Sequence, residues 1–284
     1  MKFKKIYAPI ARSLLLGLLS LSLLGCAIDF EAITAGRSSG ETNAEQATAA
    51  VRQALAPSGV LRVGVYLGSP TSWVKDPKSG ESVGIALDLG KELAKRLNVP
   101  VQVVEFDRVA QVLDSLKDGK IDFTFTNATA VRAQVMDFTV PLVRLELGYL
   151  VATGSQLQSV TEIDKPGLRV GVSQGSSSQG ALTQLYKQAK VIPADSLAKA
   201  KNMLETKQID AFATNKGILF EMSETLPGSQ VLQGRWGLEN LAIAIPKGRD
   251  AGREFVQSFA NNIGQSGLLN KVIVRSGLRG TAKD

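Results

Sequence analysis

The sequence predicts an α/β protein with two lobes, and an internal repeat is the main observation behind this prediction. The pentapeptide LRVGV occurs at residues 61–65 and again, letter for letter, at 168–172. The pattern Ile-Asp-x-x-x-Thr-Asn occurs at 121–127 and again at 209–215. Because both signals recur in the same order, we expect two units of the same construction, each with its own sheet and helices.

Short apolar strands and amphipathic helices alternate between the repeated signals. This alternation indicates βαβαβ units with parallel sheets. The first unit is longer mainly because of the loop at 67–82, which is rich in Gly, Pro and Ser. The expected strands are 61–65, 101–106, 121–126, 168–172, 190–194 and 209–214, and the expected helices are 83–97, 109–116, 179–188 and 197–206, with two more near 251–263 and 266–275.

The carboxyl ends of the expected strands predict the place of a ligand site. In open parallel sheets, ligands bind at these ends, close to helix N-termini. Thr126-Asn127 and Thr214-Asn215 mark that edge in the two units. Two such edges facing each other would form a cleft lined by hydroxyls, amides and the guanidinium of Arg132, which has no acid within four residues.

The N-terminus has the features of a targeting segment. The basic stretch MKFKK precedes the apolar run SLLLGLLSLSLL, which at about 12 residues is too short to span a bilayer. The following Leu-Leu-Gly-Cys resembles a bacterial lipobox, so Cys26 is the expected lipid attachment site; an ordinary signal peptide with an incidental cysteine is the alternative. We expect a signal peptide over 1–25, a lipid-anchored tether over 26–58 with a short helix at 44–55, and a periplasmic location or one on the outer face of the cytoplasmic membrane.

Charge and composition exclude several classes of function. Of the formal net charge of +7, Lys2, Lys4, Lys5 and Arg12 of the targeting segment supply four, and the remaining +3 gives no argument for nucleic acid. Histidine is absent and Cys26 is the only cysteine, which excludes His-ligated zinc, Ser-His-Asp chemistry and an intramolecular disulfide. Ser173 lies in a G-x-S-x-G pattern, so a lysine-assisted hydrolase stays open. No metal or cofactor is expected.

Four segments carry a resemblance to a known family. GVLRVGV, DPKSGESVGIALDLGKELAKRL, SLKDGKIDFTFTNATAVRAQVMDFTVPL and LRVGVSQGSSSQ resemble the solute-binding proteins of polar amino-acid ABC transporters, bacterial extracellular solute-binding proteins of family 3. The likeness covers roughly Gly59 to Leu278. It implies the two-lobed periplasmic-binding-protein fold, with hinge strands near 143–149 and 239–243 and a ligand enclosed between the lobes. Lobe 1 would then take 59–146 and 241–284, and lobe 2 would take 147–240.

The resemblance also implies which residues bind the ligand. Arg132 would hold the ligand's carboxylate through its planar guanidinium, with Thr126, Asn127 and Thr129 on the same loop and Ser177 from the second lobe. For Arg132 the alternative is a surface or N-cap residue that pairs with Asp137. For Ser177 the alternative is a helix cap.

Three positions depart from the family pattern. The family usually has aspartate where this chain has Asn215, and aromatic residues near Ser69 and Val109 are missing. Trp73 could replace one of these aromatic residues, or it could simply pack in the core.

An amide at 215 cannot neutralise an ammonium group. The ligand is therefore expected to carry a carboxylate and either to lack an α-ammonium or to have it paired elsewhere. Glu146 and Glu239, near the expected hinge strands, are the candidate partners, and solvated surface acids are the alternative.

The leading functional hypothesis is a monomeric, non-enzymatic binding protein. It would capture a small carboxylate-bearing solute, with an amino acid as the first candidate, and deliver it to an ABC transporter permease. An exported dehydratase or lyase of the same fold is a second hypothesis, in which Glu146 or Glu239 would supply the acid-base group. A ligand-binding receptor module is the third.

Overall fold

The computed structural model describes residues 47–282, and the expected signal peptide, Cys26 and residues 26–46 of the expected tether lie outside the described residues. None of the helices within 47–282 is long and apolar enough to cross a membrane. The strands are β1 Leu61–Tyr66, β2 Val74–Lys75, β3 Ser82–Val83, β4 Val101–Phe106, β5 Thr124–Asn127, β6 Met136–Phe138, β7 Val143–Val151, β8 Arg169–Ser173, β9 Lys190–Ala194, β10 Ala211–Asn215, β11 Gln230–Val231 and β12 Gly237–Pro246. The α-helices are α1 Ala49–Leu55, α2 Ile85–Leu97, α3 Val109–Lys117, α4 Ala130–Ala133, α5 Ser177–Leu185, α6 Leu197–Glu205, α7 Lys216–Glu224, α8 Asp250–Gln265 and α9 Leu268–Arg275, with a 3₁₀ turn at Val160–Glu162.

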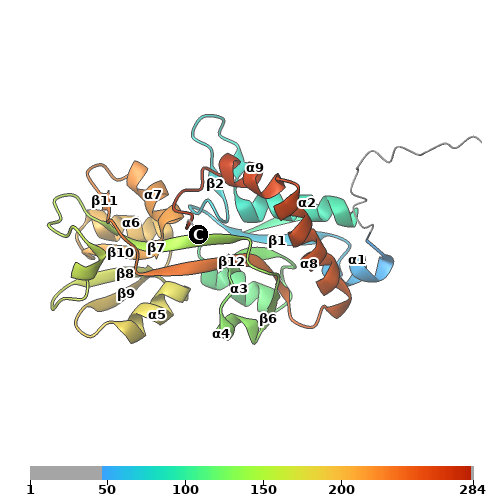
Figure 1. Cartoon of the computed structure of the whole chain (residues 1–284), viewed down its shortest axis with the longest axis horizontal. Helices are drawn as coiled ribbons and strands as arrows, with labels where there is room; N and C mark the ends of the chain where they lie inside the picture. Colours follow the sequence, from blue (N-terminus) through green and yellow to red (C-terminus); the bar gives the residue numbers. More distant parts are fainter. Residues whose placement is uncertain (1–46, 283–284) are drawn as a thin grey trace, which may run out of the picture. The chain divides into compact units, whose positions relative to one another are not determined.

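Two long antiparallel strands, β7 and β12, connect the sheet of one lobe to that of the other (Figure 1). The strand order is β5-β12-β7-β10-β8-β9, so that β12 pairs with β5 and β6, and β7 pairs with β10 and β11. β1 and β4 form a parallel pair, which meets β5 through a bridge between Val63 and Phe123. The repeated βαβαβ units therefore supply the parallel pairs, and the two connecting strands make the sheet mixed.

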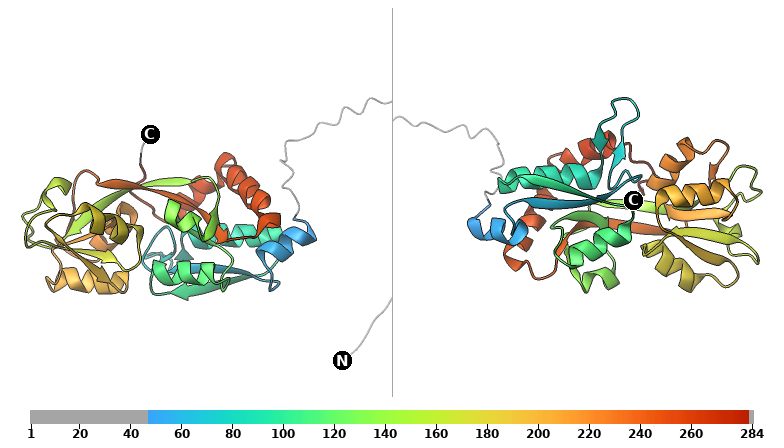
Figure 2. Two further views of the ribbon diagram at one scale, coloured as in Figure 1. Left: turned by 90° about the horizontal axis from the view of Figure 1, so that it is seen from below. Right: turned by 180° about the vertical axis from the view of Figure 1, so that it is seen from behind.

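Separate hydrophobic cores define the two lobes. In the first lobe, buried side chains of β1, α2, β5, α8 and α9 pack with the early part of β7 and with β12. In the second, the later part of β7 packs with β8, β10, α6 and α7. The views of Figure 2 show the same division, because the blue-to-green segment shares its lobe with the red C-terminal helices and the yellow-to-orange segment forms the other.

The repeated pentapeptide does the same structural work in each lobe. A Cβ on Gly64 would lie 2.2 Å from Ile121 Cδ1, and a Cβ on Gly171 would lie 2.4 Å from Ile209 Cδ1, so both positions need glycine where strand and isoleucine meet. The aspartate that follows each isoleucine binds the arginine of LRVGV. The Arg62–Asp122 and Arg169–Asp210 ion pairs measure 2.7 Å and 2.8 Å.

Helix α1 is part of the first lobe, although the sequence places its residues in the tether. Leu55 is fully buried, and it packs so closely on α8 that a Cβ on Gly252 would lie 2.5 Å from its side chain. Arg249 Nη1 also donates to the Leu55 carbonyl at 3.1 Å. The packed structure thus begins before Gly59, because this short amphipathic helix has an apolar face to bury.

Candidate ligand-binding site

A small polar cavity lies between the lobes at the carboxyl ends of β1, β5, β8 and β10. Its volume is about 30 Å³, close to that of a single water molecule, so the surrounding side chains nearly fill it. Arg132 and Glu239 are the only charged residues among those that line it. The other lining residues are Tyr66, Thr71, Val109, Thr126, Asn127, Ser173, Ser176, Ser177, Thr214, Asn215, Ile218 and Leu241.

Arg132 brings a half-buried positive charge to the cavity. Its Nη1 donates to Thr126 Oγ1 and to the Asn127 carbonyl, both at 3.0 Å, and these contacts fix the direction of the guanidinium. It forms no ion pair with any residue of the described chain. Burial lowers the pKa of Arg132, but a guanidinium stays charged at physiological pH. The cavity therefore holds a cation that is suited to an external carboxylate.

Glu239 brings the negative charge, from the hinge strand β12. It is 7% exposed, and its two oxygens accept hydrogen bonds at 3.0 Å from Ser177 Oγ and from Asn215 Nδ2. Burial raises the pKa of Glu239, and its two hydrogen bonds and the nearby Arg132 charge oppose this effect. The carboxylate is thus held in position by two residues of the second lobe.

A chain of side-chain hydrogen bonds joins the lobes across the cavity. Asn127 Nδ2 donates to Ser177 Oγ at 3.2 Å, and Ser177 in turn donates to Glu239. Asn127 Oδ1 accepts from the backbone of Asn240 at 2.9 Å. The lobes are therefore in contact. This series of hydrogen bonds begins at the Asn240 backbone and ends at the Glu239 carboxylate, both on the hinge strand β12.

The structure brings together five of the seven residues that the sequence predicts for ligand binding: Thr126, Asn127, Arg132, Ser177 and Asn215. Thr129 does not line the cavity; its hydroxyl caps α4 by accepting from the Arg132 backbone at 3.3 Å. Trp73 is 6% exposed and does not line the cavity either.

Asn215 also caps a helix. Its Oδ1 accepts from Ile218 N at 3.1 Å, so one side chain begins α7 and supports Glu239.

Sequence reasoning missed Tyr66, the last residue of β1. Its ring lines the cavity, and burial raises the pKa of its phenol. An aromatic residue at the carboxyl end of a strand was the available signal for Tyr66.

Glu146, the other candidate acid, lies outside the cavity. It accepts from Lys216 Nζ at 2.6 Å and from Arg235 Nη1 at 3.2 Å. In the antiparallel pairing of β7 and β12, Glu146 is opposite Leu238 and Glu239 is opposite Leu145. Because residues opposite each other share a face, the two glutamates point to opposite faces of the sheet.

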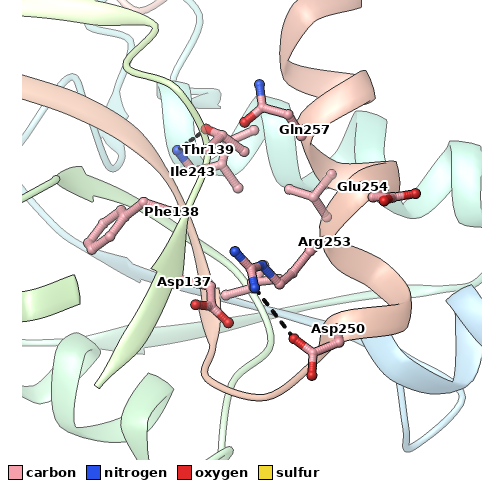
Figure 3. A pocket seen from close by; sticks show the side chains of 10 residues that line it. Asp137, Phe138, Thr139, Ile243, Asp250, Arg253, Glu254 and Gln257 are labelled. Atoms are coloured by element: carbon pink, nitrogen blue, oxygen red, sulfur yellow. Dashed lines mark hydrogen bonds and ion pairs between the residues drawn. The ribbon is translucent and has the colours of Figure 1, made fainter. Parts of the chain in front are cut away.

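Two larger cavities, each about 490 Å³, lie elsewhere. One is confined to the first lobe, between β6, β12 and α8 (Figure 3). Two ion pairs involve its lining residues: Asp137 with Lys247 at 3.0 Å, and Arg253 with Asp250 at 3.5 Å. The other lies between the lobes, beside Trp73.

The comparison with known families agrees with this architecture. Residues 61–275 match the bacterial extracellular solute-binding proteins, family 3. The chain therefore belongs to this family.

Two relatives are named for glutamine binding. The chain is 28% identical to the ABC transporter glutamine-binding protein GlnH of Bacillus subtilis over 182 residues, which is 63% of this chain and 66% of that protein, just under two thirds of its length. It is 26% identical to the glutamine-binding protein of Geobacillus stearothermophilus over 253 residues, 87% of this chain and 95% of that protein.

Solved structures show the same fold. An arginine-bound amino-acid ABC transporter substrate-binding protein, AbpA of Streptococcus pneumoniae, aligns with a TM-score of 0.71 at 21% identity, over 79% of this chain and 97% of that one. An ancestral arginine-binding protein bound to arginine aligns with a TM-score of 0.68 at 27% identity, over 76% and 97% of the two chains.

Proposed function

We propose that this chain binds an α-amino acid in the cavity between its lobes and delivers it to an ABC transporter permease. The observation that carries the proposal is the pair of opposite charges in one buried cavity, Arg132 and Glu239. Arg132 would bind the carboxylate of the solute, and Glu239 would bind its ammonium group. Membership of the family, and relatives named for binding amino acids, support the same function.

Glu239 would supply the acid that position 215 lacks. The family's usual aspartate is replaced by an amide at 215, and that amide donates to a carboxylate 3.0 Å away on the hinge strand. The cavity therefore keeps a carboxylate, which comes from Glu239 instead of from position 215. A zwitterionic solute fits these two charges better than a simple carboxylate, because a lone carboxylate would leave Glu239 buried without a counter-charge.

Binding would close the lobes around the solute. Arg132 belongs to the first lobe and Ser177 to the second, so a ligand that contacts both favours the closed state. The cavity of about 30 Å³ must widen to admit an amino acid, and lobe opening at β7 and β12 would provide the space. The lobe boundaries that we propose lie within these two strands.

We also propose that the protein acts outside the cytoplasm, held to the membrane through a lipid on Cys26, and that it does not catalyse a reaction. The cavity offers one acid and no histidine or lysine as a second proton-transfer group. Absence of turnover of the bound solute by wild type, under conditions of saturating binding, would agree with this.

Isothermal titration calorimetry on protein stripped of ligand by unfolding and refolding tests the proposal. The panel pairs amino acids, arginine and glutamine among them, with their deaminated analogues. We expect an amino acid to bind at least about 30-fold more tightly than its analogue, which corresponds to about 2 kcal/mol. Equal affinity for the two would reject Glu239 as the ammonium partner, and no binding of any amino acid would reject the function.

A further inference from the structure

The second cavity between the lobes is a groove beside Trp73, and it has the size of a small-molecule site. We call it the Trp73 groove. Its walls are the loop after β1 and the end of β4 from the first lobe, and the N-terminal half of α6 and the C-terminal end of α7 from the second. At about 490 Å³ it falls in the usual range for ligand pockets, roughly 300–1,000 Å³. None of its lining residues also lines the cavity that holds Arg132.

Part of the lining is apolar and partly open to solvent. Leu67, Trp73 and Phe106 of the first lobe and Leu197 and Met222 of the second line the groove. Leu67 is 53% exposed, which is unusual for a leucine at the junction of two lobes. A ligand with a hydrocarbon or aromatic body would cover this surface.

The lining also contains acidic residues. Glu105, Asp107 and Glu221 line the groove, and none of these carboxylates forms an ion pair within residues 47–282. The one basic lining residue, Lys201, lies 3.8 Å from Glu205 on its own helix. Burial and the neighbouring Glu224 raise the pKa of Glu221, and the positive charge of Arg279 opposes this effect. With three acids and one lysine, the lining carries a net negative charge.

Trp73 adds an unsatisfied donor at this place. Its indole Nε1 is buried and has no hydrogen-bond acceptor in the described structure. An unpaired buried donor destabilises a protein, and each such group in a native structure calls for an explanation. The same ring is a spectroscopic reporter within the groove.

The two lobes approach each other closely beside the groove. A Cβ on Gly68 would lie 3.2 Å from Leu197 Cδ1 of the second lobe, and Gly68 has a φ of +93° that favours glycine. The complete groove exists only while these walls are together.

We propose that the Trp73 groove binds a small organic cation with an apolar body, such as an alkyl or aryl amine. The apolar lining residues would contact the body, and the three unpaired carboxylates would bind the charge. Because both lobes line the groove, the cation would bind the closed arrangement better than the open one. The bound cation would then raise the affinity of the neighbouring cavity for an amino acid. By reciprocity, a bound amino acid would raise the affinity of the groove for the cation by the same factor. Binding of the cation stands without the proposed function, whereas this coupling rests on it.

Trp73 fluorescence tests the proposal directly. The chain has two tryptophans, so Trp236→Phe in the full-length protein leaves Trp73 as the sole reporter. Phenethylamine is the probe, and 2-phenylethanol is the matched neutral compound with the same body. We expect a saturable emission change with the amine and at least about 10-fold weaker binding of the alcohol. Equal binding of the two compounds, or no saturable change with the amine, would overturn the proposal.

A pair of double variants identifies the charges. Asp107→Asn with Glu221→Gln should weaken amine binding at least about 10-fold. The control variant, Asp114→Asn with Glu254→Gln, also removes two negative charges, but from exposed positions outside the groove. It should leave the affinity for the amine unchanged. An equal effect of the two double variants would show only a general response to net charge and would overturn the site.

Arg132→Ala separates this site from the proposed function. The amine should bind this variant and wild type with equal affinity. This result is expected even if neither protein binds an amino acid. Loss of amine binding in Arg132→Ala, or displacement of the amine by a tightly binding amino acid, would show that the groove is an extension of the cavity and not a second site. A higher affinity for the amino acid in the presence of saturating amine would support the coupling, and a lower affinity would contradict it.

Discussion

Asn215 donates its side-chain amide to the Glu239 carboxylate at 3.0 Å, and this contact joins the start of α7 to the hinge strand β12. The carboxylate is 7% exposed and shares its cavity with Arg132. The relationship accounts for an amide at a position where an acid is expected.

Arg132→Ala should weaken amino-acid binding by about 2–5 kcal/mol, the range for removing one partner of a desolvated charge pair, which is about 30-fold to several thousand-fold. Fold stability should change little, because Arg132 has no ion-pair partner in the described chain to leave behind. Calorimetry measures the affinity, and a melting curve measures the stability. Arg253→Ala, in the cavity of Figure 3, is the control and should bind like wild type. Unchanged affinity in Arg132→Ala would refute its role.

The affinity for an amino acid should fall as the pH is lowered into the acid range. Glu239 must be ionised to bind an ammonium group, and burial raises its pKa above the ordinary value of 4.5, so protonation begins at a higher pH than for an exposed glutamate. Below that pKa the affinity should fall by up to about tenfold for each pH unit. Titrations between pH 4 and 8 measure this slope.

Glu239→Gln should bind weakly and with no such slope. The stability of the unliganded protein provides a second readout, because a carboxyl whose pKa is raised on folding destabilises the folded state above that pKa. The melting temperature of wild type relative to Glu239→Gln should therefore rise as the pH falls through the raised pKa. A parallel pH dependence in the two proteins would contradict the assignment.

Returning the acid to position 215 should help only when Glu239 is removed. Asn215→Asp alone places two carboxyl groups side by side, so one must stay protonated, and both affinity and stability should fall at neutral pH. The double variant Asn215→Asp, Glu239→Gln has one acid again and should recover affinity to within about tenfold of wild type. Calorimetry on the two single variants and the double variant gives the coupling. Additive losses would show that the two positions do not share one role.

The two repeated ion pairs should differ in their contribution to stability. The Asp122 side chain is fully buried and pairs with Arg62 at 2.7 Å and Arg249 at 2.8 Å, whereas the side chain of Asp210 is 30% exposed. Asp122→Asn should cost about 3–5 kcal/mol, since it leaves buried arginine without its partner. Asp210→Asn should cost about 1 kcal/mol. Urea unfolding of the two variants measures both values, and a larger loss for Asp210→Asn would contradict the argument from burial.

Much of the fold follows from the repeats. The helices and strands of both units lie within a few residues of their predicted bounds, because short apolar strands and amphipathic helices carry strong periodic signals. The recurrence of Ile-Asp after LRVGV also has a local cause, which is the fit of isoleucine against glycine and of aspartate against arginine.

The site was harder to predict, because its residues meet through tertiary register. Glu146 and Glu239 look alike in sequence, and only the pairing of β7 with β12 places one inside the cavity and the other among Lys216 and Arg235. A shift of one residue would exchange their faces, and no sequence signal fixes that shift. Trp73 likewise lies in the expected loop, but it lines the Trp73 groove and not the cavity that contains Arg132.

The position of Glu239 on β12 has a consequence for how such a protein changes over evolutionary time. An acid that belongs to a lobe is tied to the packing of that lobe, and its exchange disturbs a core. Glu239 sits on one of two connecting strands, and its carboxylate accepts hydrogen bonds from Ser177 and Asn215 of the second lobe. Replacing this one side chain would change the charge of the cavity while leaving the hydrophobic cores of both lobes untouched, so a single substitution there can alter ligand preference without loss of the fold.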